Sequence, residues 1–247
     1  MAGIYKLTQT ELRFLLMFAE KRGMYGFEEM PLIEEEAEAG ECVRSLCGKG
    51  ILKADEEQKY EMDKTLELLL AIAEQPYGCF SMEDLRTGDT VRKTVVYFRD
   101  DVIGAVEQTG KMWELLWIPY LTLAIGETAN LHEPFLNAVT ERPVVETDGD
   151  RWIDERIRDG FTWQWEMWGE QLEDEKKQCS MSVLSDGKIQ LVVKETDGDR
   201  RIFSPDKADY INEITREMAY IFMESRSVRC CRGRDNRWQS SVSDFRM

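Results

Sequence analysis

The spacing of apolar residues changes twice along this chain, and each change marks a set of predicted strands. In residues 94–118, and again in residues 179–203, apolar side chains recur about every second residue between short polar turns. A period of two is typical of strands that bury one face, whereas helices repeat every 3.6 residues. Each stretch therefore predicts a three-stranded antiparallel meander. The expected strands are Thr94–Phe98, Val102–Gln108, Met112–Ile118, Cys179–Leu184, Lys188–Glu195 and Arg200–Phe203.

Helical patterns lie around both meanders. Thr8 and Glu11 form a T-x-x-E capping box at the start of the first helix. Leu7 and Leu12 occupy its staple positions, and Gly23 follows its apolar run. Because both halves of the chain show a meander followed by a helix, we expect an α+β protein of two similar halves. The other expected elements are helices over about Glu34–Cys47, from the Asp63 cap to Pro76, over Tyr120–Ile125 and after the Ser204 cap and Pro205, and a short strand Gly50–Ala54.

The two halves are predicted to form one domain. No stretch rich in proline, glycine and serine separates them, so we expect a single domain over residues 1–247, with halves at about 1–126 and 127–225. Residues 226–247 are predicted to be a basic tail in an otherwise acidic chain, either solvated or packed on acidic surface of the same chain. The arginines of this tail that stand out are Arg226, Arg229, Arg232, Arg234 and Arg237.

The composition argues against several classes of protein. With 48 Asp and Glu against 32 Lys and Arg, the chain has a net charge of −16, which disfavours a nucleic-acid partner. A hydrophobic fraction of 43% is enough for a folded core. No apolar run approaches the roughly 18 residues of a membrane span, and the first residues do not resemble a signal peptide. We therefore expect an acidic, cytoplasmic protein.

Catalytic and metal-binding patterns are missing from the sequence. The six cysteines are scattered and His132 is the only histidine, which predicts neither a zinc site nor a base-assisted nucleophile. The chain has no G-x-x-x-x-G-K-[ST] or G-x-G-x-x-G phosphate loop. We expect no catalytic residue, no metal, no cofactor, and free thiols in a reducing cytosol. A pair of carboxylates that meets only in space, as in glycosidases, stays open as an alternative.

One hexapeptide, Glu-Thr-Asp-Gly-Asp-Arg, occurs twice, at Glu146–Arg151 and at Glu195–Arg200. Asp-Gly near β-branched residues favours a hairpin turn, because glycine tolerates a positive φ angle. A calcium loop of the EF-hand type is the alternative, but neither copy supplies the alternating carboxylates and the distal glutamate. We therefore expect a turn at both copies.

An aromatic segment around residues 161–168 is the strongest candidate for binding. As a regular strand it would place its residues 161, 163, 165 and 167 on one face and residue 168 on the opposite, polar face. Aromatic and methionine side chains are enriched at the centres of protein interfaces, although they also fill ordinary core strands. The predicted partner-binding residues are Phe161, Trp163, Trp165, Met167 and Trp168.

The N-terminal third adds an order of features that is shared with a known family. These features are Leu7-Thr8 and Glu11-Leu12 at the first helix, Pro31 before Leu32, Leu46, Gly50-Ile51, the Asp63 helix cap and Pro76. In this order the chain resembles the EspG-type proteins of type VII (ESX) secretion systems. The resemblance implies two quasi-symmetric halves that share a central sheet. It also implies a bacterial, non-catalytic chaperone that binds a helical secreted protein, with no nucleic-acid or membrane partner, and with a homodimer left open.

Two other functions stay open as alternatives. A winged-helix transcriptional regulator with a sensing domain would need a basic reading helix, but the expected helix Glu34–Cys47 carries Arg44 among five glutamates. An immunity or inhibitor protein would use the acidity of the chain to neutralise a basic toxin.

Overall fold

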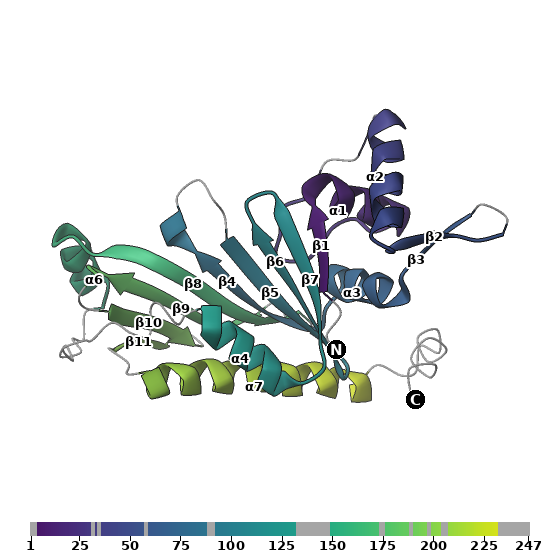
Figure 1. Ribbon diagram of the computed structural model, residues 1–247. Helices are drawn as coiled ribbons and strands as arrows, with labels where there is room; N and C mark the ends of the chain where they lie inside the picture. The colour runs from purple at the N-terminus through teal and green to yellow at the C-terminus, as the bar shows by residue number, and fades with distance from the viewer. Residues whose placement is uncertain are drawn as a thin grey trace.

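A computed structural model of the protein describes residues 4–30, 33, 36–56, 59–87, 92–131, 149–172, 176–187, 190–196, 199–203 and 207–231. Its centre is a nine-stranded antiparallel sheet with the strand order β1-β7-β6-β5-β4-β8-β9-β10-β11, shown in Figure 1. The strands are β1 (Ile4–Thr8), β4 (Gly78–Asp84), β5 (Arg92–Arg99), β6 (Val102–Thr109), β7 (Met112–Ile118), β8 (Thr162–Gln171), β9 (Lys176–Ser185), β10 (Gln190–Thr196) and β11 (Asp199–Phe203).

Helices lie on both faces of this sheet (Figure 1). On one face, the first three helices and a small hairpin stand at the β1 end and α6 stands at the β11 end. On the other face, α4 and α7 lie across the strands. We call these faces the α3 face and the α7 face. The remaining elements are α1 (Gln9–Phe18), α2 (Glu36–Gly48), β2 (Leu52–Ala54), β3 (Tyr60–Met62), α3 (Lys64–Glu74), the 3₁₀ turn η1 (Leu85–Thr87), α4 (Leu121–Leu131), α6 (Gly149–Arg158) and α7 (Lys207–Cys231).

The predicted α+β class and the shared central sheet are confirmed, and all six predicted strands are present as β5–β7 and β9–β11. Each meander has one strand more than predicted. β4 precedes the first meander and β8 precedes the second, and these two strands pair with each other at the middle of the sheet. The pairing of β4 with β8 joins the two halves through backbone hydrogen bonds.

The caps predicted for the first and third helices are also confirmed. The Thr8 N–H donates to Glu11 Oε2 over 2.7 Å, and the Glu11 N–H donates to Thr8 Oγ1 over 3.2 Å. Asp63 Oδ1 accepts from the backbone N–H groups of Thr65 and Leu66 at the start of α3. These bonds satisfy amide groups that have no partner within the helix. The first helix ends at Phe18, earlier than the apolar run suggested.

The repeated hexapeptide adopts two different structures. At the second copy, Thr196 pairs with Asp199 and Glu195 pairs with Arg200, so β10 and β11 form the predicted hairpin. At the first copy the turn prediction is wrong, because Gly149–Arg151 begins α6. The residues downstream decide between the two: Trp152 and Ile153 are buried against the sheet and stabilise a helix. Residues 146–148 and 197–198, and the predicted cap at 204–205, lie outside the described residues.

Helix α7 packs unusually close to the middle of the sheet. A Cβ atom on Gly169 would stand 2.2 Å from Cδ1 of Ile221, and one on Gly78 would stand 2.7 Å from Cγ2 of the same side chain. Glycine at these two strand positions therefore lets Ile221 reach the sheet. The helix extends to Cys231, so the first six residues of the predicted basic tail are helical, and residues 232–247 lie outside the described part.

A buried ion cluster fixes α7 to β10. Lys194 Nζ lies 2.7 Å from Glu213 Oε2 and 2.5 Å from Glu217 Oε1, and the Lys194 side chain is 7% exposed. Burial alone would lower the pKa of Lys194, but its hydrogen bonds to the two glutamates raise it above the ordinary value. For Glu213, burial alone would raise the pKa, and Lys194 holds it below the ordinary value. Lys194 and Glu213 are therefore both charged at neutral pH, and the cluster stabilises the position of the helix.

Candidate docking surface

The predicted binding strand is β8, and a bulge divides its aromatic residues between two faces. The pairing of β8 with β9 shifts by one residue between Trp163 and Trp165. This extra residue reverses the alternation. Trp165 and Met167 point to the α7 face, whereas Trp163 and Trp168 point to the α3 face. The expectation that residues 161, 163, 165 and 167 share one face is therefore wrong.

Three of the five predicted binding residues are buried. Trp165 is 2% exposed and Met167 is fully buried beneath α7. The Arg86 guanidinium lies 4.7 Å from the centre of a Trp165 ring, and Arg86 Nε and Nη2 each donate to the Asp84 carboxylate over 2.9 Å. Phe161 is buried on the α3 face beside α6. These three side chains can meet a partner only if the fold opens, so the accessible candidates are Trp163 and Trp168.

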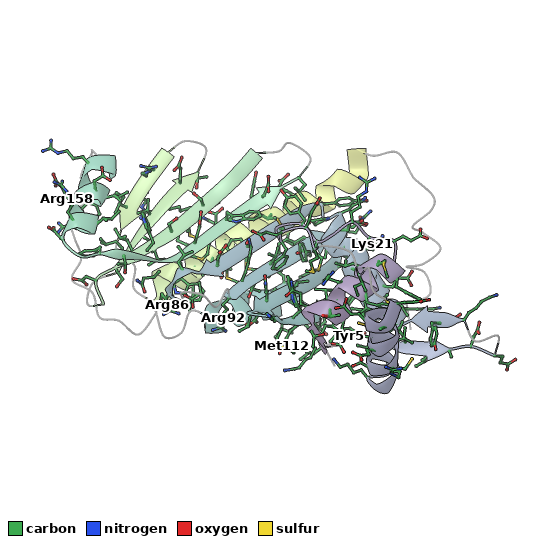
Figure 2. The ribbon with its side chains drawn as sticks, turned by 90° about the horizontal axis from the view of Figure 1, so that it is seen from above. Tyr5, Lys21, Arg86, Arg92, Met112 and Arg158 are labelled. Carbon is green, nitrogen blue, oxygen red and sulfur yellow. The ribbon has the colours of Figure 1, made fainter. Side chains whose placement is uncertain are left out.

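The accessible residues lie on the uncovered middle of the α3 face. Seen from above in Figure 2, the described helices stand over the two ends of the sheet and leave the strands between them open. We name the accessible part of β4, β5, β8 and β9 the open sheet face. Cross-strand pairing brings its residues into one patch. They are Glu83, Lys93, Trp163, Glu166, Trp168, Ser180 and Ser182, which are all partly or fully exposed.

The segment between α1 and α2 borders this patch. The Tyr97 hydroxyl donates to the Tyr25 carbonyl over 2.7 Å, and the Tyr25 hydroxyl donates to Glu170 Oε2 over 2.5 Å. The Tyr25 ring meets Trp168 edge to face at 6.4 Å. Gly26 has φ +82°, a conformation that favours glycine, and a Cβ atom there would lie 3.4 Å from the Val95 side chain and 3.8 Å from the Trp168 ring. Trp168 is thus held on one side, and the rest of the ring is available to a partner.

The charges of the open sheet face are not balanced. Glu83 and Glu166 stand directly opposite each other on β4 and β8. Lys93 Nζ lies 3.5 Å from Glu83 Oε2. Glu166 is exposed and has no ion pair or hydrogen bond to any side chain within the described residues. The patch therefore offers two tryptophan rings and one carboxylate that is available to a partner.

Two buried cysteines among the described residues are not activated for nucleophilic chemistry. Burial raises the pKa of the Cys179 thiol to about 12 and the pKa of Cys79 higher still, so both thiols are protonated and poor nucleophiles. Within the described ranges, no three His, Cys, Asp or Glu side chains are grouped to hold a metal ion. His132 lies outside them. A hollow of about 530 Å³ beside Arg22, Phe27 and Glu74 opens to solvent at the edge of the α3 face.

None of the helices in the described ranges is long and apolar enough to cross a membrane. Comparison of the sequence finds no matching family profile and no matching curated protein. Comparison of the fold does find a match. It is a chain from the structure of the Mycobacterium tuberculosis type VII secretion system chaperone EspG5 in complex with the PE25–PPE41 dimer, and the TM-score is 0.62 at 9% sequence identity. This chain has the fold of EspG5.

The match spans nearly the whole of both molecules, since it covers 89% of this chain and 95% of the other. At the level of fold it confirms the resemblance to EspG-type proteins. Because the identity is so low, the likeness to EspG5 identifies no binding residue in this chain. The open sheet face therefore stands on its own geometry.

Proposed function

We propose that this protein is a non-catalytic chaperone or adaptor that binds a helical protein substrate of a type VII (ESX-like) secretion system in the bacterial cytoplasm. The observation that carries the proposal is the EspG5-like fold, which extends over 89% of the chain. The net charge of −16 would keep a complex soluble.

We place the substrate on the open sheet face. Helices cover apolar parts of the sheet in this fold. The described helices leave the middle of the α3 face uncovered (Figure 2). Trp163 and Trp168 supply large apolar contact areas that stay partly exposed without a partner. Interfaces depend on a few such aromatic anchors. A secreted helical protein with an apolar tip would aggregate when free, and covering that tip would hold it in a soluble state until export.

The proposal is tested in two steps: the partner is first identified, and its affinity is then measured. The tagged protein is isolated from its native host, co-purifying proteins are identified by mass spectrometry, and each helical candidate is produced separately for titration calorimetry. Replacing both Trp163 and Trp168 by Ala should weaken binding by at least about thirtyfold, the effect of losing about 2 kcal/mol at an interface. Light scattering of the free protein reports whether it forms a homodimer.

The matched control is Tyr220→Ala, which truncates an aromatic side chain that is 50% exposed on the outer side of α7. This variant should bind the helical partner as the wild type does. If it loses binding while the double tryptophan variant keeps it, the partner binds the other face and the proposed surface is wrong. Recovery of duplex DNA or of a basic toxin in place of a helical protein would favour the regulator or the inhibitor.

A further inference from the structure

A row of side chains along β8 on the α3 face places a carboxylate between two tryptophans. Trp163, Glu166 and Trp168 stand opposite Leu184, Ser182 and Ser180 of β9, so they follow one another along one face of the strand. The two serines are small and leave space beside the carboxylate and the rings. A carboxylate between two indole rings offers an ion pair together with cation–π contact to one side chain.

The cross-strand pair Glu83–Glu166 shows that this carboxylate is not placed there for stability. Side chains directly opposite each other in an antiparallel pair have Cβ atoms roughly 5 Å apart, and like charges at this distance are destabilising. Of these two carboxylates, Glu83 is the one that forms an ion pair with Lys93 among the described residues. On the α7 face the comparable pair Glu107–Glu114 has a cation for each member, Arg92 and Lys6. Glu166 is therefore the member of these two pairs that lacks a cation among the described residues.

A second polar group beside this row also lacks a partner. The Ser81 hydroxyl is buried and forms no hydrogen bond within the described part of the chain. Ser81 stands directly opposite Val95 on β5 and Trp168 on β8, and thus between them. A Cβ atom on Gly26 would lie close to both the Val95 side chain and the Trp168 ring, so the ring reaches across toward Val95. The Trp168 ring therefore extends over Ser81. A small displacement of this ring would let the hydroxyl accept from an N–H group of a bound cation.

We infer that Glu166, between Trp163 and Trp168, is the recognition point for a basic side chain of the bound polypeptide, and that arginine fits it best. A guanidinium ion can stack on an indole face while its N–H groups donate to a carboxylate, which an ammonium ion does less well. The inference rests on the proposed function for its partner and names one chemical feature that the partner must present. The charge of −16 attracts such a partner before contact.

The test uses small probes, so that it does not depend on finding the natural partner. Nα-acetyl-arginine methylamide is titrated into the ¹⁵N-labelled full chain, and the indole N–H signals are assigned with Trp163→Phe and Trp168→Phe. Nα-acetyl-citrulline methylamide, which has nearly the same shape and no charge, is the matched probe. The arginine probe should shift both indole signals with a Kd in the millimolar range, roughly that of one exposed ion pair with ring contact. The citrulline probe should give no saturable shift.

Two variants in which a glutamate is replaced by glutamine test which carboxylate binds the arginine probe. Glu166→Gln should weaken the arginine probe about fivefold or more. It should leave the melting temperature unchanged or slightly raised, since it removes the repulsion from Glu83. Glu195→Gln is the matched control: Glu195 lies on the same face, is exposed, and is already paired with Arg200 over 3.2 Å. This control should bind as the wild type does.

Three results would overturn the inference: no saturable shift at either indole, equal shifts with both probes, or binding that Glu166→Gln does not change. Failure of the proposed function has a different signature. In that case the arginine probe binds and depends on Glu166, but no helical protein requires Trp163 and Trp168. The reverse result, a helical partner that requires the tryptophans and ignores Glu166→Gln, removes only the cation site.

Discussion

The tryptophans on the two faces of strand β8 differ in how far they are exposed to solvent. On the α7 side, Trp165 lies beside Met167 under a helix that is fixed by the Lys194 cluster. On the α3 side, Trp163 and Trp168 are partly exposed, and Glu166 between them is without an ion pair among the described residues. One side is closed by the chain itself, and the other side is the surface on which we propose that a partner docks. Under the proposed function, aromatic residues that look equivalent in sequence serve stability on one face and binding on the other.

Among these variants, the largest loss of stability is expected on replacing Trp165. Trp165→Ala should lower the free energy of unfolding by about 3–5 kcal/mol, because it empties a filled site under α7. Trp163→Ala, two positions away on the same strand, should cost at most about 2 kcal/mol, since its side chain is partly solvated already. Urea denaturation of both variants measures the difference. Equal losses of stability would show that the two tryptophans are equally buried, which would contradict the difference between the two faces of β8.

The next effect is expected from the ion cluster that closes the α7 face. Lys194→Met should cost about 3 kcal/mol in urea denaturation, because it leaves Glu213 and Glu217 buried without their main cation. Adding Glu213→Gln and Glu217→Gln to Lys194→Met should recover most of the loss. A variant that loses nothing would show that the cluster is solvated and that α7 is held by apolar contacts alone.

A smaller effect is expected at the closest approach of α7 to the sheet. Gly169→Ala should cost about 1–3 kcal/mol, since the new methyl group would overlap Cδ1 of Ile221. Ile221→Val deletes that methyl group and should cost about 1 kcal/mol by itself. The double variant should be more stable than the sum of the two losses predicts. Additive losses in thermal denaturation would mean that α7 does not lie on Gly169.

The smallest effect is a gradual loss of stability in acid. Glu11 and Asp84 are buried, and desolvation opposes their charge, but hydrogen bonds from Lys49 and Arg86 respectively hold each pKa below the ordinary value, as Lys194 does for Glu213. A carboxyl group with a lowered pKa in the folded state stabilises the fold above its ordinary pKa of about 4. That contribution is lost as the pH falls through the lowered value.

Thermal denaturation between neutral pH and about pH 3 should therefore show a falling melting temperature below about pH 4. Glu213→Gln should reduce this pH dependence, because it removes one of the carboxyl groups whose pKa is lowered in the folded state. An unchanged pH dependence in this variant would contradict the placement of the Glu213 charge in the buried ion cluster with Lys194.

Much of the fold could be predicted from the sequence. The period of two located both meanders, and the capping residues Thr8 and Asp63 located two helix starts. Strand β4 was missed because most of its residues are buried on both faces, which removes the alternation on which the prediction depends. Strand β1 was missed because Leu7 and Thr8 also fit the start of the helix that follows.

The candidate site was predicted only in part. The sequence identified the aromatic segment, but the division of its side chains depends on the bulge after Trp163, which no glycine or proline marks. A shift of one residue moves every later side chain to the opposite face. Glu166 was missed because, in an acidic chain, one glutamate beside tryptophans looks like any solvated residue. Its significance comes from Glu83 on β4, which is 83 positions earlier in the chain.

The most direct test of the central claim is to ask which face the partner touches. A photo-reactive benzoylphenylalanine is placed at Ser182 on the open sheet face, or at Tyr220 on the outer side of α7, and the protein is irradiated in its native host. Cross-linked products are then identified by mass spectrometry. We expect a helical protein attached at Ser182 and absent at Tyr220. Attachment of that protein at Tyr220 alone would contradict the proposed docking surface.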